Sequence, residues 1–353
     1  MLPYTVVMSL ALACALIGIA SDRQNDPLNI VWVRALWLVL LTGFVGARFE
    51  VGGDWDAYSR FFHQLKGADV GSVLRWDPAY GALNWIGANV FGSSVVFVNS
   101  VCAAFLSAGV IGFCRILPNP SLALQLTLPY LVIVVGMGFT RQATAIGLIM
   151  WALASANESR TANSIILMVL AATFHKAAAL LVPLLLWFGN TASKVSKGII
   201  LLVAATVAGA LLLPTAGYSI GRYLFEDWAS QGALIRALFN FSAAIVFLRF
   251  SEQLTFSDAH NNLFRAFSYA AIGFSLLLVL SPTSAIVDRM GLFLLPFQIA
   301  IFSTLPVLFA GRSFRRRLAE ISLVVFAWAQ FLGWFQLSPY ASSWLPYRNV
   351  MAL

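Results

Sequence analysis

The chain has 353 residues, of which 60% are hydrophobic and only 10% are charged. A soluble globular domain carries about a quarter charged residues, so the composition excludes that class and indicates a helical membrane protein. The net charge is +8, but the basic residues are scattered along the loops outside one cluster at 312–317, so we expect no nucleic acid partner.

Apolar runs predict an all-α polytopic integral membrane protein with about twelve transmembrane helices. The predicted spans are 2–20, 30–46, 94–116, 122–138, 142–156, 162–173, 177–188, 198–213, 234–250, 263–280, 291–309 and 318–337. The amphipathic segment 54–65 and the short apolar segment 78–91 predict a re-entrant or interfacial hairpin. We therefore expect one transmembrane domain over 1–353, with an external loop at 47–93 that carries this hairpin.

The basic residues also predict an orientation. The arginine cluster at 312–317 places the loop before the last span in the cytoplasm, and alternation along the chain then puts both termini outside. Basic residues are nevertheless numerous in the predicted outer loops, which runs against the positive-inside rule. An anionic ligand at the outer face would explain why they are retained there.

The segment 48–58 is a charged patch between two apolar runs. Its charged side chains near the start are Arg48, Glu50, Asp54 and Asp56. Because a charge at the bilayer centre costs roughly 2.5–3.5 kcal/mol on insertion scales, this segment must lie at a membrane surface or in a wet cavity. Gly52 and Gly53 let the backbone turn before Asp54. Asp54 is a candidate base or substrate-orienting group, and it can also cap the helix that follows.

Arg141 and Gln142 open a predicted helix that follows Gly136 and Gly138. An arginine at a helix start can form bidentate bonds to phosphate, supported by the free backbone N–H groups there. The glycines would let a ligand approach the backbone closely. The alternative is an interfacial arginine that reaches lipid headgroups.

His175 and Lys176 interrupt a long apolar stretch. Ionisable residues are rare in such stretches, and a histidine can act as a general base or as a hydrogen-bond donor to phosphate near neutral pH. A satisfied structural histidine is the alternative. The residues alone leave open whether Asp54 or His175 is the base.

Further charged and aromatic residues allow two interpretations each. Asp77 precedes Pro78, a common helix start, so a structural role competes with a functional one. Asp288 and Arg289 form either a mutual ion pair or a second phosphate clamp. Tyr340 is expected at the membrane interface, with stacking on a sugar as the alternative.

The sequence has no phosphate-binding P-loop and no zinc-protease motif, and its three histidines lie far apart. We therefore expect no cofactor and no metal site. An ATP-driven pump and a metal-dependent enzyme are both disfavoured.

Taken in order, the motifs resemble those of the EpsG-like branch of Wzy-type polysaccharide polymerases. The residues that carry the resemblance are Arg48, Val51, Gly52, Asp54, Tyr58, Asp77, Pro78, Tyr80, Asn99, Arg141, Gln142, His175, Lys176, Ala177, Ala178, Asp288, Arg289 and Met290. It covers about residues 30–300.

The resemblance implies a metal-independent glycosyltransferase in the bacterial cytoplasmic membrane. Its substrate would be an undecaprenyl-diphosphate-linked oligosaccharide, joined into polymer at the outer face, with membrane lipid, a chain-length regulator and a flippase as partners. Asp54, His175 and Arg141 would be catalytic. The residues that would bind the substrate or its diphosphate are Arg48, Lys176, Arg289, Tyr58, Asp77, Tyr80 and Gln142.

Three other functions compete with a polymerase. A lipid-dependent glycosyltransferase of the ligase type shares the anion site and differs in its acceptor. A flippase or transporter would show charges near the bilayer midplane and internal repeats, whereas here the charges gather at one predicted surface. A sugar acyltransferase would draw acyl groups from the cytoplasm, so its charged motifs should lie on that side.

Overall fold

The structure of the chain is a computed structural model, and it describes residues 1–21, 23–75, 77–157, 160–181, 230–280 and 284–350. These residues form helices joined by turns and contain no β-strand. The α-helices are α1 (Leu2–Ala20), α2 (Val31–Gly46), α3 (Trp55–Leu65), α4 (Pro78–Asn89), α5 (Val95–Ile116), α6 (Pro120–Thr127), α7 (Gly136–Gly138), α8 (Thr140–Asn157), α9 (Thr161–Phe174), α12 (Ala233–Phe250), α13 (Asp258–Leu280), α14 (Ser284–Gly291), α15 (Leu295–Thr304) and α16 (Ser313–Leu337).

The helices confirm the helical membrane-protein class, and the number of spans stays open. In the described residues, seven helical stretches are long and apolar enough to cross a membrane. Helices α2, α8 and α9, which are not among these seven, coincide with the predicted spans 30–46, 142–156 and 162–173. The predicted span 198–213 and most of 177–188 lie outside the described residues. A total of about twelve spans therefore remains a prediction.

The stretch Pro120–Gly138 is the buried centre of the bundle. It is continuous through α6, the π-helical segment η4 (Leu128–Val135) and α7, and all of it is buried. A helix that is apolar on every side lies either in lipid or inside a protein core, and the burial of this stretch places it in the core. Accordingly α1, α5, α15 and α16 all contact α6. The π-helical turns bring Tyr130 and Val134 to the cavity described below.

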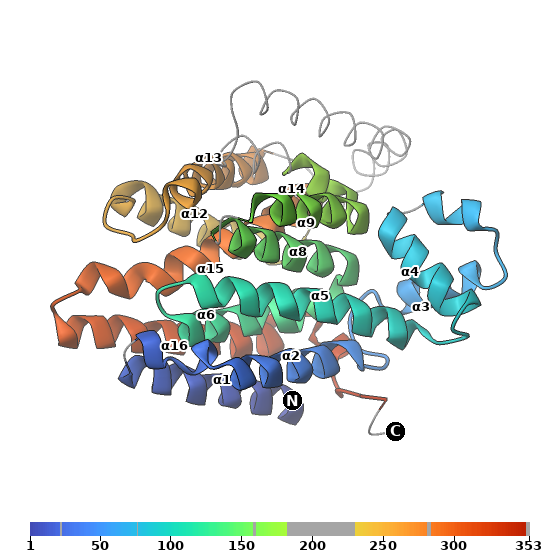
Figure 1. The fold of residues 1–353 in the computed structure, drawn as a ribbon, viewed down its shortest axis with the longest axis horizontal. Helices are drawn as coiled ribbons and strands as arrows, with labels where there is room; N and C mark the ends of the chain where they lie inside the picture. Colours follow the sequence, from blue (N-terminus) through green and yellow to red (C-terminus); the bar gives the residue numbers. More distant parts are fainter. Residues whose placement is uncertain (22, 76, 158–159, 182–229, 281–283, 351–353) are drawn as a thin grey trace.

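Glycines allow α5 and α8 to pack very closely. A Cβ atom placed on Gly109 of α5 would lie 1.8 Å from the carbonyl oxygen of Gly147 of α8. Since apolar burial drives little association between helices in lipid, such close backbone contact is a principal source of stability there. In Figure 1, α2 and α9 lie on the two sides of this pair, and both contact it.

The two ends of the bundle differ in character (Figure 1). The turn between α15 and α16, where the arginine cluster 312–317 begins, lies at the left end of the view. The amphipathic helix α3, the short helix α4 and the C-terminus lie at the right end. The predicted hairpin segments 54–65 and 78–91 are thus helices, and α3 buries one face that includes Tyr58 and Phe61.

We predict that Gly109→Val prevents α5 and α8 from docking, because no side chain fits against the Gly147 carbonyl. The expected result is loss of the monodisperse peak when detergent-solubilised protein is examined by size-exclusion chromatography. Gly273→Val in α13 is the matched control, since a Cβ atom there meets nothing within 4 Å. Equal behaviour of the two variants would contradict the importance of this contact.

Candidate active site

A cavity of about 270 Å³ lies between the start of α3, the junction of α7 and α8, α14 and the residues after α16. Its polar lining consists of Asp54, Ser230, Gln231, Arg236, Asp288, Arg289 and Ser338. Its aromatic lining consists of Tyr130, Phe139, Trp334, Tyr340 and Trp344. Carboxylates, arginines and aromatic rings from distant parts of the sequence therefore meet around one space.

Asp54 occupies the N-cap position of α3, but its carboxylate makes no capping hydrogen bond. The side chain instead lines the cavity. Burial raises the pKa of the Asp54 carboxyl, an effect that the positive charges of Arg289 and Arg141 oppose. A half-buried carboxylate with a raised pKa is a suitable proton acceptor for a bound ligand.

Asp77 joins three helices at the same end of the bundle. Its carboxylate accepts a hydrogen bond of 2.6 Å from the Arg141 guanidinium at the start of α8 and one of 2.9 Å from the backbone N–H of Lys176. Asp77 precedes α4 yet makes no capping bond to that helix. The side chain of Arg141 remains 30% exposed, so its ion pair with Asp77 leaves part of the side chain accessible.

His175 lies between α9 and the short 3₁₀ helix η5 (Lys176–Leu180), where its ring contacts that of Phe293. Burial lowers the pKa of His175, with Arg141 and Arg289 adding to the effect, so the imidazole is neutral at physiological pH. Its Nδ1 accepts a hydrogen bond from the Ala177 N–H at 3.3 Å. A neutral imidazole that accepts at Nδ1 carries its proton on Nε2, which makes His175 a donor in this arrangement.

Tyr58 and Tyr80 lie behind Arg141. Both rings are buried and contact each other edge to face, with ring centres 5.7 Å apart. The Arg141 guanidinium lies 5.9 Å from the centre of the Tyr80 ring. The two tyrosines thus support the position of the arginine by packing and by a cation–π contact.

Arg48 is fully buried and does not line the cavity. Its guanidinium donates to the carbonyl oxygens of Val45 and Val51 and, at 2.7 Å, to the hydroxyl of Thr140 at the start of α8. The resemblance implied substrate binding for this residue, whereas the structure buries its side chain between the end of α2, the loop 47–52 and the start of α8. There it fixes the course of the backbone that leads to Asp54.

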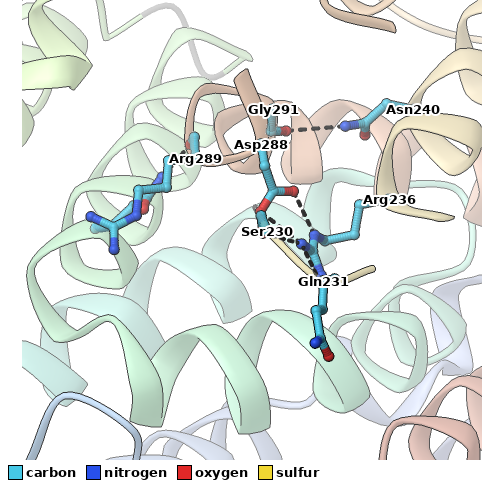
Figure 2. A network of polar contacts seen from close by, with 8 residues as sticks. Ser230, Gln231, Arg236, Asn240, Asp288, Arg289 and Gly291 are labelled. Carbon is cyan, nitrogen blue, oxygen red and sulfur yellow. Dashed lines mark hydrogen bonds and ion pairs between the residues drawn. The ribbon is translucent and has the colours of Figure 1, made fainter. Parts of the chain in front are cut away.

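Asp288 and Arg289 do not form the mutual ion pair that the sequence suggested (Figure 2). Arg236, which sequence analysis assigned no role, donates to Asp288 from Nε at 2.6 Å and from a terminal nitrogen at 2.7 Å. Ser230 adds a third hydrogen bond to the same carboxylate. An arginine near the start of the predicted span 234–250 was the available signal, since a charge there needs a partner.

Arg289 points away from this network in Figure 2 and faces the Phe139 ring at 5.8 Å. Among the described residues, no carboxylate lies within ion-pair distance of its guanidinium. The buried side chain of Gln142 donates to the Arg289 backbone carbonyl at 2.6 Å. Gln142 therefore positions Arg289, which is available to bind an anion in the cavity.

The residues after α16 form part of the site, and we call residues 338–350 the C-terminal strap. The strap runs along the loop 47–52: Gly52 donates to the Ser343 carbonyl at 2.8 Å and Phe49 to the Arg348 carbonyl at 3.0 Å. It supplies Tyr340 and Trp344 to the cavity wall. Periodicity in the sequence did not predict this pairing, because both the strap and the loop 47–52 have irregular backbone.

Comparison with known proteins gives one family. Residues 31–349 match the model described as the EpsG family. No curated protein and no solved structure matches the chain. The matched range includes α2 to α16 and every residue of the cavity lining.

We predict that Gly52→Ala lowers the apparent melting temperature. Gly52 has a φ of +106°, and a Cβ atom would lie 2.2 Å from the Met137 carbonyl oxygen. In the variant, the loop 47–52 would therefore have to move away from α7. A cost above about 1 kcal/mol is expected where alanine replaces a glycine of positive φ. Gly53→Ala is the control, because its Cβ would make only ordinary contact with Trp344 at 3.8 Å. Equal melting temperatures for the two variants would contradict this account of the loop.

Proposed function

The chain belongs to the EpsG family, the family of Wzy/EpsG-type polysaccharide polymerases, and we propose that it joins lipid-linked repeat units into polymer. The donor would be a growing glycan on a polyprenyl diphosphate, undecaprenyl diphosphate in bacteria. The acceptor would be the non-reducing end of another lipid-linked unit. The observation that carries this proposal is a cavity lined by aromatic rings, by the Asp54 carboxylate and by Arg289, for which the described residues provide no ion-pair partner.

The charges of the cavity suit a diphosphate leaving group. Arg289 has no carboxylate partner among the described residues, and the partly exposed Arg141 lies close enough to affect the pKa of Asp54. Cations held ready for the negative charge that develops as the diphosphate leaves would stabilise the transition state. The Nε2–H of His175 would donate to a phosphate oxygen, in keeping with its tautomer.

Asp54 would serve as the general base. It would take the proton of the attacking sugar hydroxyl while the hydroxyl oxygen forms a bond to the anomeric carbon. The bond from that carbon to the phosphate oxygen breaks, and the lipid diphosphate leaves with the electron pair. Cleavage of the bond between sugar and diphosphate supplies the driving force, so the step balances without a nucleotide.

The arrangement of the two bundle ends supports an external site. The arginine cluster 312–317 begins at the end opposite α3, α4 and the C-terminus (Figure 1). With that cluster in the cytoplasm, the charged residues around Asp54 face outward. This orientation fits a polymerase that uses repeat units already carried across the cytoplasmic membrane.

The proposal is tested with purified protein in detergent, a lipid-diphosphate-linked repeat unit as sole substrate, and excess chelator. We expect a ladder of products in regular mass steps. A single transfer to a different acceptor would indicate a ligase. Movement of the lipid across proteoliposomes without a ladder would indicate a transporter, and the polymerase proposal would then be wrong.

Two substitutions test which residue is the general base and which is the hydrogen-bond donor to phosphate. We expect Asp54→Asn to reduce polymerisation by about 10²–10⁴-fold, the usual contribution of a general base. His175→Gln keeps an N–H donor near the position of Nε2 and should retain most activity. Product ladders from membranes with equal protein levels provide the measurement. If His175→Gln were inactive and Asp54→Asn active, His175 would be the base and Asp54 would not.

The pH dependence of polymerisation should follow the ionisation of Asp54. Its active form is the carboxylate, and burial raises its pKa, so activity should fall as the pH is lowered through a value above that of an exposed aspartate. The measurement is kcat against pH with saturating lipid-linked substrate. Activity that rises on acidification would be inconsistent with a carboxylate base.

A further inference from the structure

The C-terminal strap gives the cavity a wall of a different chemical kind from the others. Trp344 is buried, donates from Nε1 to the Ile133 carbonyl at 3.0 Å and contacts the Trp334 ring at 4.8 Å between ring centres. It is therefore a fixed part of the framework. Tyr340 also lines the cavity, but 55% of it is exposed, so a ligand could cover its ring.

Hydrogen bonds fix the backbone around Tyr340 to the loop that carries Asp54. The Tyr340 N–H donates to the Ser338 hydroxyl at 3.3 Å, and three residues later the Ser343 carbonyl accepts the Gly52 N–H. Gly53 in turn lies against the Trp344 ring. Tyr340 and Asp54 therefore lie on two segments that are hydrogen-bonded to each other and that line one cavity.

Charge is distributed unevenly around the cavity. Arg289 and the Arg236–Asp288 pair come from α14 and α12, while the strap contributes Tyr340, Trp344 and the neutral hydroxyl of Ser338. An anionic group would bind on the α14 side. A neutral ring with apolar C–H faces and outward hydroxyls would fit the strap side, because aromatic faces attract C–H groups and exclude water.

We propose that Tyr340 is the platform of an acceptor sugar subsite, a refinement that rests on the proposed polymerase function. The terminal sugar of the incoming repeat unit stacks on the Tyr340 ring and presents its hydroxyl to Asp54. The phosphates of that unit lie at its other end, which explains a subsite on a wall without charge. The donor diphosphate meanwhile occupies the α14 side.

The test uses two substrates. The donor is the lipid-linked repeat unit, and the acceptor probe is the repeat-unit oligosaccharide released from the same lipid by mild acid. Tyr340→Ala should raise the KM for the acceptor about tenfold, as expected for the loss of one good aromatic contact, with the donor KM unchanged. Tyr340→Phe keeps the ring and should behave like the wild type.

Tyr269→Ala is the matched control, because Tyr269 is a similarly exposed tyrosine (61%) on α13. It should leave both KM values unchanged. An unchanged acceptor KM in Tyr340→Ala, with active wild type, would overturn the subsite while the polymerase function stands. A raised donor KM would also overturn it and assign Tyr340 to the donor or to the lipid interface.

Binding separates the two proposals if the wild type makes no polymer. The released oligosaccharide, radiolabelled, is then titrated against protein in detergent by equilibrium dialysis. Binding that Tyr340→Ala weakens and Tyr269→Ala preserves would support the subsite although the polymerase function had failed. Equal binding by all variants, or none by the wild type, would overturn the subsite.

Discussion

The buried guanidinium of Arg48 is the interaction on which the arrangement of the site depends. A buried cation needs hydrogen-bond partners in place of water, and Arg48 donates to the carbonyls of Val45 and Val51 and to Thr140 of α8. Those bonds fix the end of α2 and the loop 47–52 against the start of α8. Asp54 extends from one side of this loop, and the C-terminal strap pairs along it. The proposed base Asp54, the start of α8 with Arg141, and the aromatic wall are therefore positioned together.

Several basic residues at this end of the bundle form ion pairs with carboxylates of the same chain. Arg141 pairs with Asp77, Arg236 with Asp288 and Arg348 with Glu50. An excess of arginine in predicted outer loops is thus partly structural, and does not by itself require an anionic ligand. Arg289 differs, because no carboxylate of the described residues pairs with it while it lines the cavity. The inference of an anion site consequently rests on this residue more than on the number of charges.

The two candidate bases illustrate what hydrogen bonding adds to residue type. Asp54 and His175 are equally plausible in the sequence, since both can accept a proton near neutral pH. The His175 ring accepts the Ala177 N–H at Nδ1, which leaves its proton on Nε2, whereas the Asp54 carboxylate makes no capping bond. One therefore offers a proton and the other can receive one.

The sequence by itself determined the helical class and the bounds of most described helices, because each apolar run must satisfy its backbone hydrogen bonds within lipid. It also predicted site roles for Asp54, Asp77, Arg141 and His175, because ionisable side chains between apolar runs are costly. Only the tertiary structure decided their partners. The Asp77–Arg141 pair, the Arg236–Asp288 pair and the strap along loop 47–52 join residues far apart in the chain. Such contacts have no local periodicity, since they depend on which helix ends the packing of the bundle brings together.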